Sequence, residues 1–347
     1  MRNTFLAVLA CASAITGVTA HPERHDHSKV HPPAIHARGT DKCARQIEHR
    51  RDAAFLKRRN ALGKRSTSNA NRFMYKELQN KTCTLSPDTI FGPYDVDGEL
   101  HRHDVREGQD GVDLYLDLGL IDVETCEPLS DAWLTIWSCN ATGTYSGYIG
   151  IDPDTVEAYD GWTTRTDGTT DDSTFLRGIS KTNEAGIGEF LTIFPGYYSS
   201  RTTHIHVTVQ SKVNGDDTSY SDAATQHVGQ LFFPEDLINS VYQLAPYHAH
   251  LATLNRTLNS EDSLYPTANS DGNDAIIATE LLGQTLAEGL IGYITIGVNR
   301  SAAAIATTGE QVNVQGAIPT VSLSASAQAA ANTIDIAQGY RPNGMRV

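Results

Sequence analysis

Short apolar runs separated by Gly, Asp, Asn and Thr fill the chain from about residue 83 to residue 300. Within each run apolar and polar residues alternate, which places one kind of side chain on each face, as in a half-buried β-strand. The alternation is clearest over residues 112–118, 133–137, 190–194, 204–209 and 294–298. Several short strands joined by turns predict a mainly β protein, built as a sandwich or a barrel.

Few helices are expected. Residues 41–62 contain no proline and are rich in basic side chains, which predicts a short N-terminal helix. Residues 275–290 give the one helical pattern in the body of the chain, and the Ala, Ser and Thr that follow predict a poorly ordered tail. We therefore expect a β-sandwich domain over residues 66–300, between a basic, His-rich segment at 21–65 and a low-complexity tail at 301–347.

The N-terminus has the features of a secretory signal. Arg2 supplies a basic start, residues 5–15 form a short apolar stretch, and small residues at 18–20 suit cleavage. These features predict a signal peptide at 1–20, a mature chain that begins near His21, and a secreted, extracellular protein. The apolar stretch is too short to cross a bilayer and no later one is long enough, so no transmembrane segment is expected.

Sequons and cysteines agree with secretion. Glycosylation is predicted from the Asn-x-Ser/Thr sequons at Asn80, Asn140, Asn255 and Asn299. Two disulfides are predicted among the cysteines that remain after signal cleavage, Cys43, Cys83, Cys126 and Cys139. We favour Cys126 with Cys139, while a bond that ties the basic helix to the sandwich through either of them stays open. Propeptide cleavage after Lys64-Arg65 would leave three cysteines, so the even count favours retention of residues 21–65.

The charge of the chain limits its partners. Residues 66–347 carry fourteen Lys and Arg against thirty-six Asp and Glu, within a formal net charge of -14 for the whole chain. An acidic body of this kind repels phosphate backbones, so nucleic-acid binding is not expected.

The residues with the clearest chemistry lie around a His-x-His pair. His204 and His206 stand two apart on a predicted strand and point to one face, so both can bind one ion. Tyr198 lies six residues upstream beyond a Pro-Gly turn, and Tyr145 supplies a second phenol. Two imidazoles and two phenolates suit ferric iron, whereas zinc more often recruits Cys, His and carboxylate. The alternatives are that Tyr197 faces the metal, or that Tyr145 is a surface aromatic.

On these residues the sequence resembles the intradiol ring-cleavage dioxygenases, particularly their secreted fungal branch. The resemblance runs from Cys83-Thr-Leu-Ser-Pro and Gly92-Pro-Tyr94 to about Asn299. It includes Gly143-Thr-Tyr145-Ser146, Phe175-Leu-Arg177-Gly178, Phe194-Pro-Gly-Tyr-Tyr198, Arg201-Thr-Thr-His204-Ile-His206 and Gly229-Gln230-Leu-Phe-Phe233. It implies a transthyretin-like β-sandwich with one or two helices, a non-haem Fe(III) cofactor, and catechol-type substrates cleaved with O2.

The resemblance also implies a role for each site residue. Tyr145 and His204 would be equatorial metal ligands, and Tyr198 and His206 the axial pair. Catechol would chelate the ferric ion and displace Tyr198, which leaves as a base or as a free phenol. Arg201 would stabilise the charge that develops on the bound ring, and Gln230 would lie over the same ring. The product would be a muconate-type diacid, formed by cleavage between the two hydroxylated carbons.

Other readings stay open at this point. Arg201 could only pair with a carboxylate, and Gln230 could only satisfy a strand edge. The whole chain could be a non-catalytic, glycosylated β-sandwich that binds a ligand, or a copper or zinc enzyme that uses His204 and His206. Tyr197, Ser138 and Asp95 depart from the pattern usual in the fungal branch, which leaves the preferred catechol open. Assembly into a homodimer also stays open.

Overall fold

The computed structural model describes residues 92, 94–149, 153–154, 169–215, 219–270, 273–301 and 313–315. The predicted signal peptide, the basic helix at 41–62 and nearly all of the tail lie outside these residues. Within the described part, no helix is long and apolar enough to cross a membrane.

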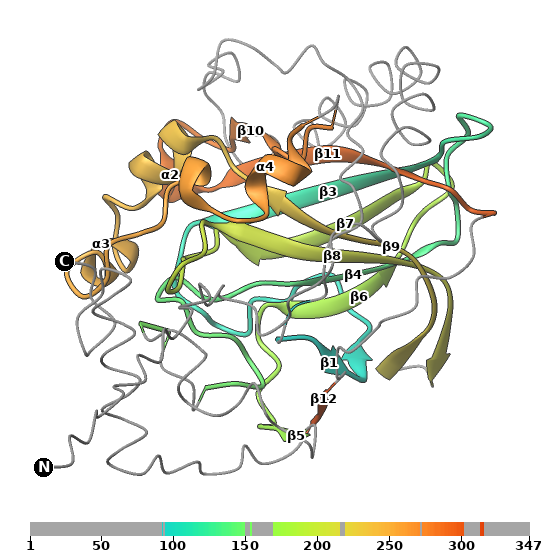
Figure 1. The fold of residues 1–347 in the computed structure, drawn as a ribbon, viewed down its shortest axis with the longest axis horizontal. Coiled ribbons are helices and arrows are strands. Elements are labelled where there is room, and N and C mark those ends of the chain that lie inside the picture. Colours follow the sequence, from blue (N-terminus) through green and yellow to red (C-terminus); the bar gives the residue numbers. More distant parts are fainter. Residues whose placement is uncertain are drawn as a thin grey trace, which may run out of the picture.

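Two main sheets form the body of the protein (Figure 1). The four-stranded sheet has the order β10-β11-β3-β7, with β3 at Asp113–Asp122, β7 at Ile187–Ile193, β10 at Ala278–Leu281 and β11 at Leu290–Val298. The five-stranded sheet has the order β2-β9-β8-β4-β6, with β2 at Glu99–Leu100, β4 at Trp133–Trp137, β6 at Arg177–Lys181, β8 at His204–Gly215 and β9 at Ser219–Phe232. A small third sheet has the order β1-β12-β5 and joins Val96–Asp97, Asn313–Gln315 and Thr169–Thr170.

The core lies between the two main sheets. One cluster of buried apolar side chains joins Leu116 and Leu118 of β3 and Ile296 of β11 to Ile136 of β4 and Val207 of β8. β11 is buried at every position, as expected for a strand that pairs in parallel with β3 inside a sheet. All five predicted strand segments are confirmed, and the mainly β sandwich is the fold of this chain.

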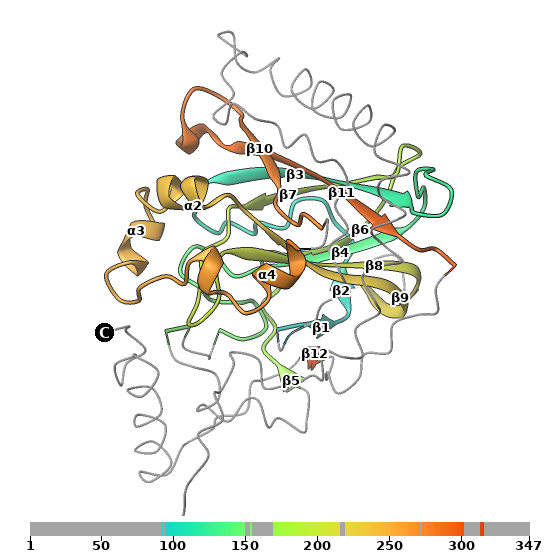
Figure 2. The same ribbon diagram turned by 45° about the horizontal axis from the view of Figure 1, so that its top comes forward.

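Three short helices follow β9 (Figure 2). α2 at Glu235–Val241 and α3 at Tyr247–His250 lie together at one end of the sheets, and α4 at Tyr265–Ala268 packs against β9 through Phe232. A 3-10 turn at Asn259–Glu261 precedes α4. This segment therefore brings residues from far along the chain next to the start of β8.

The predicted helix at 275–290 is wrong. That stretch contains β10, a 3-10 turn at Leu286–Glu288 and the first residue of β11. Its Ile277 and Thr279 are β-branched residues that favour an extended chain. The Ile277 amide donates to the Phe232 carbonyl of β9, and β10 then pairs antiparallel with β11. Pairing along the sheet outweighs the helix propensity of the Ala and Leu residues.

The predicted Cys126–Cys139 disulfide is also wrong, because Cys139 is a buried free thiol. Cys126 is disulfide-bonded, with a partner outside the described residues. The two cysteines flank the extended strand β4, and a strand rises about 3.3 Å per residue, so its ends lie beyond the roughly 7 Å that a disulfide can bridge. With Cys139 unpaired, the even cysteine count no longer favours retention of residues 21–65.

Candidate metal centre

The two imidazoles meet on one face at the start of β8. His204 Nε2 lies 3.1 Å from His206 Nε2, and both side chains are buried. The Nδ1 of His204 donates to the Thr202 carbonyl at 2.6 Å, which leaves the lone pair of its Nε2 directed toward His206. The pair therefore presents nitrogen atoms to one point in space.

Pairing between strands fixes the second imidazole. β4 pairs with β8 so that Trp137 stands opposite His206, and the indole stacks on the imidazole with ring centroids 4.7 Å apart. On the other side of β8, Gln230 of β9 stands opposite the same histidine. His206 is held between its two neighbouring strands.

Both predicted phenols join the histidines. The Tyr145 hydroxyl lies 3.5 Å from His204 Nε2, and the Tyr198 ring lies 5.7 Å from the His204 ring and 5.6 Å from the Tyr145 ring. Tyr198 reaches this place through a tight turn in which the Arg201 amide donates to its carbonyl at 3.2 Å, with Ser200 at a positive φ of 64°. The structure thus gathers all four predicted ligands from a loop, a turn and one strand.

Tyr197 points elsewhere. Its hydroxyl donates to the Leu254 carbonyl, and its ring stacks on His250 at 4.4 Å. Adjacent side chains on an extended segment face opposite ways, so placing Tyr198 in the cluster turns Tyr197 toward helix α3.

Arg201 lies beside the cluster and is completely buried. Its Nε donates to Asp262 Oδ2 at 2.7 Å, and its Nη2 donates to Gln230 Oε1 at 2.5 Å. Gln230 Nε2 is buried and has no hydrogen-bond partner among the described residues, which suits a donor that meets a bound molecule. The structure therefore brings both predicted polar residues to the same place as the four predicted ligands.

No family model and no curated protein matches the chain. Among solved structures, the chain is similar to an intradiol ring-cleavage dioxygenase from Tetranychus urticae, with 28% identity and a TM-score of 0.50. The match covers 64% of this chain and 98% of that one. The fold of this chain is that of intradiol ring-cleavage dioxygenases. A catechol 1,2-dioxygenase from Pseudomonas arvilla C-1 aligns more loosely, with 18% identity, a TM-score of 0.40, and coverage of 65% of this chain and 67% of that one.

The donor set of this chain fits a metal cation. Burial, reinforced by the Arg201 guanidinium, lowers the pKa of His204 to about 3, so the imidazole is neutral and available as a ligand. Burial raises the pKa of the Tyr145 phenol well above its ordinary value, and the neighbouring Tyr198 phenol raises it further. Only a strong local positive charge can make such a phenol ionise near neutral pH.

The type of donor narrows the choice of cation. In the described part of the chain, no three His, Cys, Asp or Glu side chains gather as a metal site. The oxygen donors that the described residues place beside the two imidazoles are the phenols of Tyr145 and Tyr198. A set of imidazole and phenolate donors suits iron better than zinc, because zinc sites are usually built from thiolates, imidazoles and carboxylates.

Sequence reasoning missed Asp262. This buried carboxylate binds Arg201 and also accepts from the Thr202 amide at 2.9 Å and from the Leu264 amide at 2.8 Å. It thus supports the guanidinium and the chain just before His204 at the same time. Asp262 lies 61 residues after Arg201, in the turn before α4, and no local pattern in the sequence marks it.

Proposed function

We propose that this chain is a secreted, Fe(III)-dependent intradiol dioxygenase that opens catechol-type rings between their two hydroxylated carbons and releases muconate-type diacids. The observation that carries the proposal is the convergence of Tyr145, Tyr198, His204 and His206 in one buried cluster. A fully buried arginine beside that cluster adds the charge that a bound catecholate requires.

The four proposed ligands differ in how firmly the chain holds them. His206 is fixed by Trp137, and His204 by the Thr202 carbonyl. Tyr198 sits in a four-residue turn outside the sheets, so its displacement leaves the strand pairing intact. When bound, ferric iron lowers the pKa of the substrate hydroxyls and makes the ring reactive toward O2.

Tyr198 is proposed to act as the base that receives a substrate proton. Its phenolate oxygen is a strong base in a buried site, because burial disfavours the charged form of a phenol. Transfer of a proton from a catechol hydroxyl to this oxygen leaves a neutral phenol, which no longer competes for the metal. The tight turn to Arg201 keeps that phenol beside the substrate.

Arg201 is proposed to stabilise negative charge on the bound ring. Guanidinium stays protonated under all working conditions, so its role is electrostatic and it does not act as a base. The Asp262 carboxylate fixes its Nε edge, while its Nη2 holds the Gln230 amide. Gln230 then has its Nε2 available for a substrate oxygen.

Secretion and glycosylation are proposed from the sequence. An extracellular enzyme that acts on catechols outside the cell is supported by the leader at 1–20, by the sequons and by the resemblance to the secreted fungal branch. The ring substituents it prefers are best found by comparing turnover of catechol, protocatechuate and hydroxyquinol on the same preparation.

The visible spectrum tests the proposal directly. Purified protein loaded with Fe(III) should be coloured, because tyrosinate bound to ferric iron absorbs visible light, and its band should shift when catechol is added. Oxygen uptake and a diacid product should follow. Tyr198→Phe should weaken iron binding and turnover. A colourless protein that binds copper or zinc would identify a His-x-His metal enzyme, and a protein that binds catechol without oxygen uptake would identify a binding module.

A further inference from the structure

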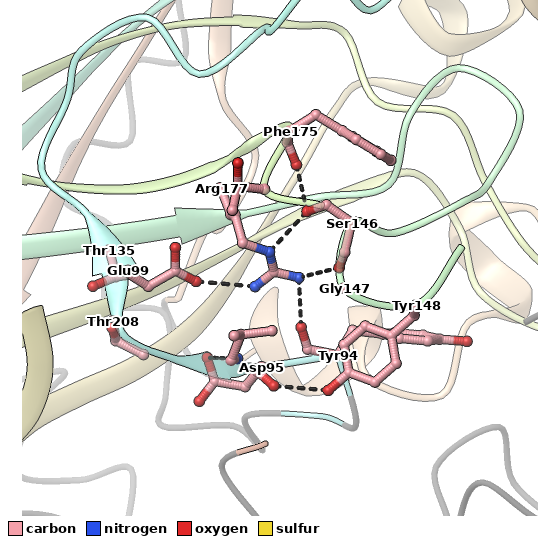
Figure 3. A network of polar contacts seen from close by, with 12 residues as sticks. Tyr94, Asp95, Glu99, Thr135, Ser146, Gly147, Tyr148, Phe175, Arg177 and Thr208 are labelled. Atoms are coloured by element: carbon pink, nitrogen blue, oxygen red, sulfur yellow. Dashed lines mark hydrogen bonds and ion pairs between the residues drawn. The ribbon is translucent and has the colours of Figure 1, made fainter. Parts of the chain in front are cut away.

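A second buried arginine lies next to the loop that carries Tyr145. Arg177, at the start of β6, is 1% exposed and has no part in the proposed chemistry. Figure 3 shows its guanidinium at the centre of a polar network. Nε donates to Ser146 Oγ at 2.8 Å, and Nη2 donates to the carbonyls of Ser146 at 2.8 Å and Tyr94 at 2.9 Å.

The charge of Arg177 is balanced within the network. Nη1 lies 2.9 Å from Glu99 Oε1 of β2, and the two side chains are only 2% and 6% exposed. A buried ion pair has a large desolvation cost and often adds little net stability, so it is weak evidence for a stabilising role. The remaining hydrogen bonds of Arg177 point to a role other than stabilisation.

Those bonds join two segments that flank a proposed ligand. Ser146 directly follows Tyr145, and Tyr94 stacks on the Tyr145 ring with centroids 4.2 Å apart and planes at 9°. Tyr94 also meets the Tyr198 ring edge to face at 5.6 Å. The Tyr148 hydroxyl donates to the Asp95 carbonyl at 2.8 Å and holds the same segment from its other side (Figure 3).

We propose that Arg177, held by Glu99, is a positioning residue for Tyr145. By joining the Tyr94 carbonyl to both oxygens of Ser146, it keeps the Tyr94 ring stacked on the Tyr145 ring and fixes the direction of the Tyr145 hydroxyl toward His204. The stack restricts rotation of a phenol that stands on a loop rather than on a strand. The part of this inference that concerns metal binding rests on the proposed function, and the part that concerns the stack does not.

The stack is tested first in the full chain without metal. In NMR of protein labelled with ¹³C-tyrosine, the ring signals of Tyr145 are assigned by their loss in Tyr145→Phe. The Tyr94 ring should displace them by its ring current, and Tyr94→Leu gives the value without a stack. Arg177→Lys keeps a charge near Glu99 but loses the fork that reaches three acceptors. Its Tyr145 signals should move most of the way to the unstacked value.

Two further variants make the result decisive. Ser146→Ala removes the acceptor of Nε together with the hydrogen bond that the Ser146 hydroxyl donates to the Phe175 carbonyl. It should move the same signals part of the way, and it is the variant to measure if Arg177→Lys does not fold. Arg106→Lys alters a half-buried arginine that binds Asp104 and Asp113 and should leave the signals in place. Unmoved Tyr145 signals in the folded Ser146 and Arg177 variants would overturn the proposal.

Ferric iron then serves as a second probe. Loss of a residue that orients a metal ligand typically weakens metal binding by about 10- to 100-fold, and we expect that loss for Arg177→Lys together with a shifted tyrosinate band. Unchanged iron affinity in a variant with a disrupted stack would overturn the link to the metal. If wild-type protein gives no tyrosinate band at all, the proposed function fails, while the NMR result still stands or falls separately.

Discussion

Two buried arginine–carboxylate pairs flank the candidate centre, and they differ in what the guanidinium binds. Arg201 and Asp262 have side chains that are 0% exposed, and Nη2 of Arg201 donates to a side-chain amide, that of Gln230. Arg177 and Glu99 are nearly as buried, yet the other bonds of Arg177 go to two backbone carbonyls and a hydroxyl.

The difference shows how one residue type takes two roles. The charge of Arg201 acts on the cluster itself: it helps to lower the pKa of His204 and opposes the effect of burial on the pKa of Tyr145. Arg177 instead donates hydrogen bonds to Ser146 and to the Tyr94 carbonyl, which lie next to the proposed ligand Tyr145. Arg201 binds side chains and lies beside the cluster, which suits a role in chemistry, whereas Arg177 binds backbone carbonyls, which suits a role in positioning.

The largest effect on turnover is expected from substitution of Arg201. Arg201→Ala should reduce turnover by about 100- to 1000-fold, as removal of a preorganised charge usually does. Because the single variant leaves Asp262 buried without its cation, we expect it to be destabilised, and Arg201→Ala/Asp262→Asn to recover stability but no activity. Iron content and oxygen uptake, measured on both, check this. Wild-type oxygen uptake would remove Arg201 from the mechanism, and loss of iron would make it a support for His204.

At the other pair the main loss should be stability. Glu99→Gln leaves Arg177 its bonds to Tyr94 and Ser146 but removes its counter-charge, which should cost about 3–5 kcal/mol of unfolding free energy, because it leaves a buried charge uncompensated. Urea unfolding measures this loss. Turnover per folded molecule should fall less than tenfold, and a fall as large as that of Arg201→Ala would erase the distinction between the two pairs.

Acid should act on the Asp262 pair in a defined range. Burial alone would raise the pKa of Asp262, but Arg201 outweighs it and holds that pKa at about 2, below the roughly 3.9 of an unfolded aspartate. Stability from this carboxylate is therefore fully present above pH of about 4 and is lost as the pH falls through about 2. Unfolding measured against pH should show this loss in wild type, and a slope of the same size in Arg201→Ala/Asp262→Asn would contradict it.

The smallest effect is expected at Tyr197, outside both pairs. Tyr197→Phe removes one hydrogen bond to the Leu254 carbonyl and should cost about 1 kcal/mol of stability. Iron loading and turnover should remain at wild-type levels, in contrast to Tyr198→Phe. Equal loss of iron in both variants would contradict the assignment of Tyr198, and not Tyr197, as the ligand.

Sequence patterns predicted the features that depend on residues close together in the chain. Alternation placed the strands, and the spacing of His204 and His206 placed both on one face of β8. The carboxylates of the two pairs escaped notice because they lie 61 and 78 residues from their arginines, and only the folded chain joins them. The helix expected at 275–290 failed for a similar reason: pairing of β10 with β11 decided the conformation there.

The position of the two histidines has a consequence for how the centre assembles during folding. β8 and β9 are consecutive strands paired antiparallel, and their register already sets Gln230 opposite His206. Closing such a hairpin loses little chain entropy, because its partners are close in sequence. The phenol of Tyr145 must instead be brought in over 59 residues. We expect the two imidazoles to be placed early, with Tyr145 joining them only once β4 has paired with β8.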